Sequence, residues 1–295
     1  KKRLELLKRQ KNRTSGFIMQ SRYKMSDKPI KKLFSKHKGL SVVIIAIASL
    51  SILSLLSYLI WDKDLLKWQR QNLPNLNKPL IIKGIVQLGK AWLLVWLLFC
   101  WALLTTCRKK ALIALIALFL IMFIVFPLKA TTNRLRPNKV SSNSTQLNNE
   151  SYAFHCLSFP SGDTASVFAV AAAILPFIGW PARTIAFALA SLIGILRVVY
   201  FAHYLSDIFA GAAIGIIAGY LAYQLIASVP ILSKFLLELV DRKIILAVVV
   251  LIPMIIAISK GLDDLFIFSI FYPPLVIIVY LWSKVKKTYL ASNTF

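Results

Sequence analysis

The feature that most constrains this chain is a run of 22 residues without a charged side chain, from Leu40 to Trp61. As an α-helix rising about 1.5 Å per residue, this run is long enough to cross a hydrocarbon layer of about 30 Å. Similar apolar segments follow, and 58% of all residues are hydrophobic, which exceeds the share typical of soluble domains. The sequence therefore predicts a helical protein with several membrane spans.

We predict eight spans and an all-α fold class, a polytopic membrane helical bundle. Their approximate limits are 40–61, 86–107, 111–128, 163–179, 183–201, 205–229, 244–260 and 265–283. A transmembrane β-barrel is excluded, because its strands would alternate apolar and polar residues. In the sixth span Gly211, Gly215 and Gly219 recur every four residues, which predicts one helix face suited to close packing.

The formal net charge of +25 lies mostly outside the spans, and fourteen Lys and Arg fall within residues 1–39. Lys and Arg concentrate on the cytoplasmic side, so we expect both termini there and the segments 62–85 and 129–162 on the other side. Basic residues at that surface also contact anionic lipid head groups. No nucleic-acid-binding motif accompanies the charge, so nucleic acid is not an expected partner. The stretch that begins at Met25 resembles a native start, and we interpret residues 1–24 as an upstream extension.

Three short stretches are polar where a membrane favours apolar residues: Lys129–Pro137, Phe159–Thr164 and Arg197–Asp207. In the predicted topology all three lie at the outer ends of spans three to six. Ionisable groups at membrane depth usually mark a functional site. We therefore expect the three stretches to converge when the helices pack as a bundle.

Lys129, Arg136 and Arg197 are three cations without a matching cluster of carboxylates. Lys129 and Arg136 are seven residues apart, so two helical turns would place them on one face. A phosphate would neutralise such a cluster, and arginine can bind it with two parallel hydrogen bonds. Lys129 alone would be read as an interface residue that reaches toward the head groups, as Arg134 and Lys139 nearby are.

Two further pairs carry chemistry. Ser161 and Gly162 directly precede an apolar helix, where a serine N-cap and free backbone amides form an anion site. His203 and Asp207 are four residues apart at a predicted helix start, hence on one face. A carboxylate that accepts from one imidazole nitrogen fixes the tautomer and leaves the other nitrogen nucleophilic.

In this order, Lys-x6-Arg-Pro, Pro-Ser-Gly and Arg-x5-His-x3-Asp resemble the three signature blocks of the type-2 phosphatidic acid phosphatase superfamily. The resemblance covers roughly residues 84–229. It implies a six-helix core in which His203 attacks phosphorus to form a phosphohistidine and Asp207 orients it. It further implies that Lys129, Arg136, Ser161, Gly162 and Arg197 hold the phosphate. It implies no metal and no cofactor.

The chain departs from the family pattern at Asp163, where the second block usually ends in histidine, the general acid for the leaving group. The third block also opens with Leu196 instead of serine. Asp163 is expected to serve as the acid, with a role for His155 as an alternative. A third possibility is a leaving group that needs little protonation, such as the phosphate of a diphosphate. An inactive relative is a fourth.

We predict a metal-independent hydrolase of a lipid phosphate monoester or diphosphate. Undecaprenyl diphosphate, lipid A and phosphatidylglycerol phosphate are the candidate substrate types, in a bacterial inner membrane with the active site on the periplasmic side. A lipid phosphotransferase would use the same covalent intermediate. An anion or lipid transporter is a different class, against which the absence of an inverted repeat argues. A purely structural subunit leaves His203 and Asp207 unexplained.

The predicted organisation has three parts. Residues 1–39 form a basic cytoplasmic segment, residues 40–229 the six-span phosphatase core, and residues 230–295 two further spans with a basic tail. Pro273 and Pro274 would kink the last span.

Overall fold

The computed structural model describes residues 38–73, 80–104, 108–140 and 156–229, and their regular secondary structure is helical. The chain divides into two compact units, Lys1–Val42 and Val43–Phe295. The described part of the first unit is only the beginning of one helix. The predicted spans at 244–260 and 265–283, the basic segment up to residue 37 and His155 lie outside the described residues.

The helices follow one another as α3 (Lys38–Leu56), the π-helix η1 (Ser57–Trp61), α4 (Asp62–Asn72), α5 (Leu80–Gln87), α6 (Ala91–Leu104), α7 (Arg108–Thr132), α8 (Gly162–Ile174), the 3-10 helix η3 (Leu175–Phe177), α9 (Trp180–Val199) and α10 (Leu205–Ser228).

Within the described residues, four helical segments are long and apolar enough to cross a membrane: Leu40–Asn72, Arg108–Thr132, Trp180–Val199 and Leu205–Ser228. A shorter apolar helical segment covers Gly162–Phe177. Large apolar side chains on these helices are exposed, among them Phe123, which is 64% exposed on α7. Such surfaces are stable against lipid and costly in water. The protein is an all-α, multi-pass membrane protein, as the run lengths predicted.

The predicted span 86–107 is not one continuous helix. α5 ends at Gln87 and α6 begins at Ala91, with a turn between them in which Gly89 N donates to Val86 O at 3.2 Å. A Cβ added to Gly89 would lie 2.8 Å from Cγ2 of Ile193, so the turn lies against α9. A hydropathy average over residues 86–107 does not detect the close approach of one glycine to another helix.

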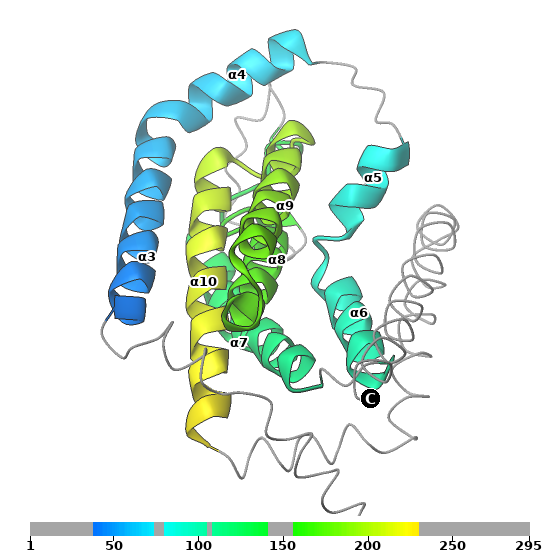
Figure 1. Ribbon diagram of the computed structural model, residues 1–295. Helices are drawn as coiled ribbons and strands as arrows, with labels where there is room; N and C mark the ends of the chain where they lie inside the picture. The colour runs from blue at the N-terminus through cyan, green and yellow to red at the C-terminus, as the bar shows by residue number, and fades with distance from the viewer. Residues whose placement is uncertain (1–37, 74–79, 105–107, 141–155, 230–295) are drawn as a thin grey trace, which may run out of the picture. The chain divides into compact units, whose positions relative to one another are not determined.

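The centre of the described fold is formed by α7, α8 and α10, which pack against one another (Figure 1). The packing of α8 on α10 is close enough to need glycine. A Cβ added to Gly211 would lie 2.5 Å from the carbonyl oxygen of Ser161, and one added to Gly215 would lie 2.4 Å from that of Ala165. Gly219 makes the same kind of contact with Ala169 at 2.7 Å. The predicted packing face is confirmed.

We expect Gly215→Ala to lower the free energy of unfolding by about 1–3 kcal/mol, because the added methyl group must push the backbones of α8 and α10 apart. Unfolding in detergent, followed by circular dichroism, measures this change. Gly179→Ala is the matched control, since the nearest atom to its added Cβ, in Pro181, is 4.0 Å away. Equal stability of the two variants would contradict the close packing.

Candidate active site

Segments far apart in the sequence are joined by backbone hydrogen bonds at the ends of α7, α8, α9 and α10. Ser158 N donates to Arg134 O at 2.7 Å, which links the segment before α8 to the loop after α7. Ser161 N donates to Asp207 O at 3.1 Å, which links the start of α8 to the first turn of α10. The structure therefore brings the three polar stretches of the sequence to one place.

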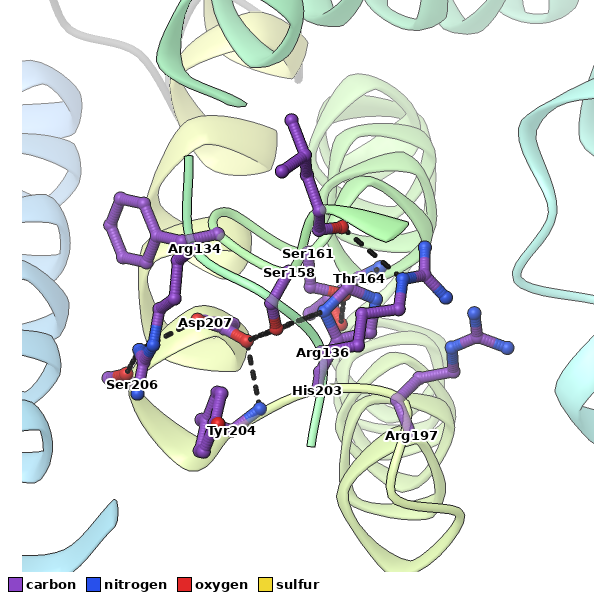
Figure 2. Close-up of polar contacts among 12 residues, drawn as sticks. Arg134, Arg136, Ser158, Ser161, Thr164, Arg197, His203, Tyr204, Ser206 and Asp207 are labelled. Carbon is purple, nitrogen blue, oxygen red and sulfur yellow. Dashed lines mark hydrogen bonds and ion pairs between the residues drawn. The ribbon is translucent and has the colours of Figure 1, made fainter. Parts of the chain in front are cut away.

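The centre of this place is a buried histidine–aspartate pair. His203 is 2% exposed and Asp207 is fully buried. Nδ1 of His203 lies 3.5 Å from Oδ2 of Asp207 and 3.5 Å from Oγ of Ser158 (Figure 2). Oδ2 of Asp207 also accepts hydrogen bonds from Oγ of Ser158 and, at 2.8 Å, from the backbone amide of Tyr204. The carboxylate is thus fixed on the Nδ1 side of the imidazole.

The expectation that His203 and Asp207 share a helix face is wrong, because His203 precedes α10 and Tyr204 is the N-cap residue. The two side chains meet because the Asp207 carboxylate turns back toward the N-cap, as in a capping box. The backbone amide of His203 donates to Arg197 O at 3.3 Å. Phe201, in the same turn, has a φ of 55°, a backbone conformation that is rare for residues other than glycine. The turn between α9 and α10 therefore places the histidine.

Lys129 and Arg136 bind the same backbone carbonyl. Lys129 Nζ donates to Leu157 O at 2.8 Å, and Arg136 Nε donates to the same oxygen at 3.2 Å. Lys129, at the end of α7, is only 8% exposed, so its side chain does not reach toward the lipid head groups as that of an interface residue would. Burial, and next the charge of Arg197, lowers the pKa of Arg136. The cations are therefore close together in a poorly solvated place, where an anion is strongly favoured.

The third cation is paired with the residue that departs from the family pattern. Nη2 of Arg197 lies 2.5 Å from Oδ2 of Asp163, which belongs to the first turn of α8. Nε of Arg197 is buried and, among the described residues, has no hydrogen-bond partner. A buried donor without a partner costs free energy unless a ligand accepts from it. In Figure 2 the guanidinium groups of Arg136 and Arg197 extend in the same direction.

Ser161 is fully buried and forms the N-cap of α8. Its Oγ lies 2.9 Å from Oγ1 of Thr164 and accepts from Thr164 N at 3.4 Å. The hydroxyl is therefore occupied by capping in this structure. Gly162 is the first residue of α8, where the positive end of the helix dipole and the first backbone amides favour an anion.

Sequence reasoning missed four polar residues that contact the histidine–aspartate pair or its partners: Asp62, Arg134, Ser158 and Ser206. Arg134 was taken for an interface residue together with Lys139. Lys139 is exposed, whereas Arg134 donates to Asp207 Oδ1 at 3.1 Å. One signal could have indicated Asp62, which is the first charge after the long uncharged run.

The fold and the site define a multi-pass helical membrane protein with a buried histidine–aspartate pair beside three cations. The family model of the PAP2 superfamily matches residues 110–230, the part of the chain that holds the three sequence blocks. The resemblance drawn from the three sequence blocks is confirmed.

Two solved structures are similar to the chain. LpxE of Aquifex aeolicus is 27% identical, with 55% of this chain and 94% of that chain covered and a TM-score of 0.45. A transmembrane PAP2-type phosphatidylglycerolphosphate phosphatase of Bacillus subtilis is 22% identical, with 64% and 94% covered and a TM-score of 0.38. No curated protein matches the chain.

Proposed function

We propose that this protein is a membrane lipid phosphatase in which His203 is the nucleophile. The observation that carries the proposal is the burial of His203 against Asp207, beside Lys129, Arg136 and Arg197, within a PAP2 superfamily segment. A histidine held by a carboxylate is a nucleophile, and clustered cations stabilise the charge of a phosphoryl group in transfer.

The proposed reaction has two steps. Nε2 of His203 forms a bond to phosphorus while the bond from phosphorus to the leaving oxygen breaks, and the electron pair stays on that oxygen. Asp207 accepts from Nδ1–H and stabilises the positive charge that develops on the ring. Water then forms a bond to phosphorus while the bond from phosphorus to Nε2 breaks. This returns the neutral His203 ring, and inorganic phosphate leaves with the protons of the water. The three cations and the amides at the start of α8 bind the phosphoryl oxygens in both steps.

The ion pair of Asp163 with Arg197 supports a diphosphate as the preferred substrate. A carboxylate held by a guanidinium at 2.5 Å accepts hydrogen bonds and is poorly suited to donate a proton. A monoester releases an alkoxide, which needs a general acid, whereas a diphosphate releases a phosphate, which does not. We therefore favour a lipid diphosphate of the undecaprenyl type over lipid A or phosphatidylglycerol phosphate. From the distribution of Lys and Arg in the loops, we further propose that the site lies on the periplasmic side of a bacterial inner membrane.

Phosphate release from a panel of lipid monophosphates and diphosphates in detergent tests this proposal. We expect the highest kcat/KM with a diphosphate, the same rate with and without EDTA, and little change in kcat for Asp163→Asn. If Asp163 is instead the general acid, Asp163→Asn will lower kcat for monoesters by about 10²–10⁴-fold. Phosphate that appears on an added lipid and not in water would identify a phosphotransferase. No reaction with any lipid by the folded protein would overturn the proposal.

The dependence of kcat/KM on pH should show that His203 stays neutral at pH values below the usual pKa range of histidine. Burial lowers the pKa of His203 from its usual value of 6.5, and Asp207 acts in the opposite direction without reversing the shift. The neutral ring is the nucleophile, so kcat/KM should hold as pH falls to 6.5 and decline only below it. A phosphate substrate also titrates near pH 6. Two substrates whose phosphates have different pKa values separate protonation of His203 from protonation of the substrate. A decline in kcat/KM that is due to His203 occurs at the same pH with both substrates. A decline in kcat/KM that begins above pH 6.5 and occurs at the same pH with both substrates would contradict the assignment of His203 as the group that titrates.

A further inference from the structure

Asp62 is a buried carboxylate at the start of α4, before the PAP2 superfamily segment begins. The residue is 3% exposed. Its Oδ1 accepts from the backbone amide of Ser206 at 3.1 Å, and its Oδ2 accepts from Ser206 Oγ at 2.5 Å and from Arg134 Nη2 at 2.7 Å. A buried carboxylate needs such partners, because its charge is otherwise costly away from water. Both partners lie next to the histidine–aspartate pair.

Arg134 joins Asp62 to Asp207. One amino group of its guanidinium donates to Asp62, and the other donates to Asp207 Oδ1 at 3.1 Å. The guanidinium carbon lies 3.7 Å from the centre of the Tyr204 ring and 5.1 Å from that of Tyr58, which restricts its motion. Charges therefore alternate from Asp62 through Arg134 to Asp207, and Asp207 faces His203. Figure 2 shows Arg134, Asp207 and His203 of this series.

The backbone before Asp62 has an irregularity. A π-helical turn covers Ser57–Trp61, and the amide of Asp62 donates to Ser57 O. Such turns insert one residue into a helix, and they occur often at functional sites. An inserted residue rotates all later side chains by about 100° around the helix axis, since α-helices have about 3.6 residues per turn. Ser54 Oγ donates to Ser206 O at 2.9 Å, so the helix before the insertion is itself tied to α10.

The helix that follows Asp62 is bound to the loops of the site. Gln69 Nε2 donates to Val198 O at 3.4 Å, in the last turn of α9. Arg70 donates to Pro137 O at 3.2 Å and to Val140 O at 2.7 Å, in the loop after α7. α4 therefore contacts the loop that carries Arg136 and the end of α9, and through Asp62 it also contacts Ser206 in the first turn of α10.

We propose that Asp62 is a positioning residue for the nucleophile, acting through Arg134 to hold Asp207 so that its Oδ2 faces Nδ1 of His203. The inference rests on the proposed phosphatase site and adds a residue from outside the superfamily segment. With Asp62 present, Arg134 divides its two amino groups between two carboxylates. Without that charge, both amino groups can bind Asp207 in a bidentate pair, which draws Oδ2 away from His203.

The kinetic test compares Asp62→Asn with Asp64→Asn. Asp64 is an exposed carboxylate in the same helical turn, so its variant controls for loss of charge on α4. We expect Asp62→Asn to lower kcat for lipid phosphate release by about 10–100-fold with KM within about twofold, because a misplaced nucleophile slows the reaction and leaves phosphate binding intact. In an Arg134→Gln background the same change should cost much less. Additive effects, or an effect confined to KM, would overturn the proposal.

A spectroscopic test does not depend on finding the substrate. In ¹⁵N-histidine-labelled protein at neutral pH, the His203 signals are identified by their loss in His203→Gln. We expect wild type and Asp64→Asn to show one tautomer, with the proton on Nδ1, and Asp62→Asn to show a mixture. Groups around the ring besides Asp207 are Ser158, Arg136 and Arg197, and all of them are unchanged in these variants.

Two outcomes separate the two proposals. If no lipid is hydrolysed but the tautomer changes in Asp62→Asn, the phosphatase proposal fails and the positioning role stands. A tautomer identical to wild type in the folded variant overturns the positioning role. If Asp62→Asn does not fold, Arg134→Lys replaces it, since lysine keeps the charge and lacks the fork that binds two carboxylates. A wild-type tautomer and kcat in Arg134→Lys would likewise overturn the proposal.

Discussion

Replacement of His203 by glutamine is expected to lower phosphate release by at least about 10⁴-fold, since loss of a covalent nucleophile removes most of the rate enhancement of an enzyme. Glutamine keeps a polar side chain beside Asp207 and Ser158 but has no nitrogen that attacks phosphorus. Wild-type protein quenched in alkali during turnover should carry one phosphoryl group in its intact mass. His203→Gln should carry none.

The control for this prediction is thermal unfolding of both proteins in the same detergent. His203 is buried, so a variant that fails to fold would also be inactive. Folded His203→Gln that still releases phosphate at a rate near wild type would exclude the phosphohistidine route.

Arg197→Gln is expected to lower kcat/KM by about 10²–10³-fold, the usual cost of removing one group that stabilises transition-state charge. Two observations indicate that substitution of Arg197 should lower activity more than substitution of either other cation. Its Nε is buried without a protein partner in the described part of the chain, and its Nη2 forms an ion pair with the side chain of Asp163. Lys129 and Arg136, by contrast, also hold the backbone at Leu157.

Lys139→Gln is the matched control, because it removes one positive charge from the exposed part of the loop after α7. Initial rates over a range of lipid phosphate concentrations give kcat and KM for each variant. Similar values for Arg197→Gln and Lys139→Gln would show that the net charge of this region matters and that the position of Arg197 does not.

The fold was predictable where one physical signal dominates. Uncharged runs such as Leu40–Trp61 predict membrane helices, because hydrocarbon selects by length and polarity alone. The break at Gly89 was not predictable, since the close approach of Gly89 to Ile193 on α9 exists only in the folded chain. The same limit applies to the π-helical turn at Ser57–Trp61, which no local pattern in the sequence indicates.

The residues that gather at the proposed site were predictable from the sequence, and their geometry was less so. The order and spacing of three blocks indicated His203, Asp207 and the three cations. The spacing gave a wrong reason for the approach of His203 to Asp207, because a capping residue turned the carboxylate back along the chain. Asp62 and Arg134 are 72 residues apart, and only the folded chain shows their contact.

The glycine contacts between α8 and α10 have a consequence for how the protein tolerates its surroundings. Backbones in direct contact leave no compressible side-chain layer between the two helices, and Ser161 N is fastened to Asp207 O. The gap between the start of α8 and the first turn of α10 is therefore set by direct backbone contact and one backbone hydrogen bond. Membranes of different thickness can tilt the pair as one body but hardly change that gap. Catalysis at such a site should depend on how a lipid reaches it, and little on the bilayer in which the protein lies.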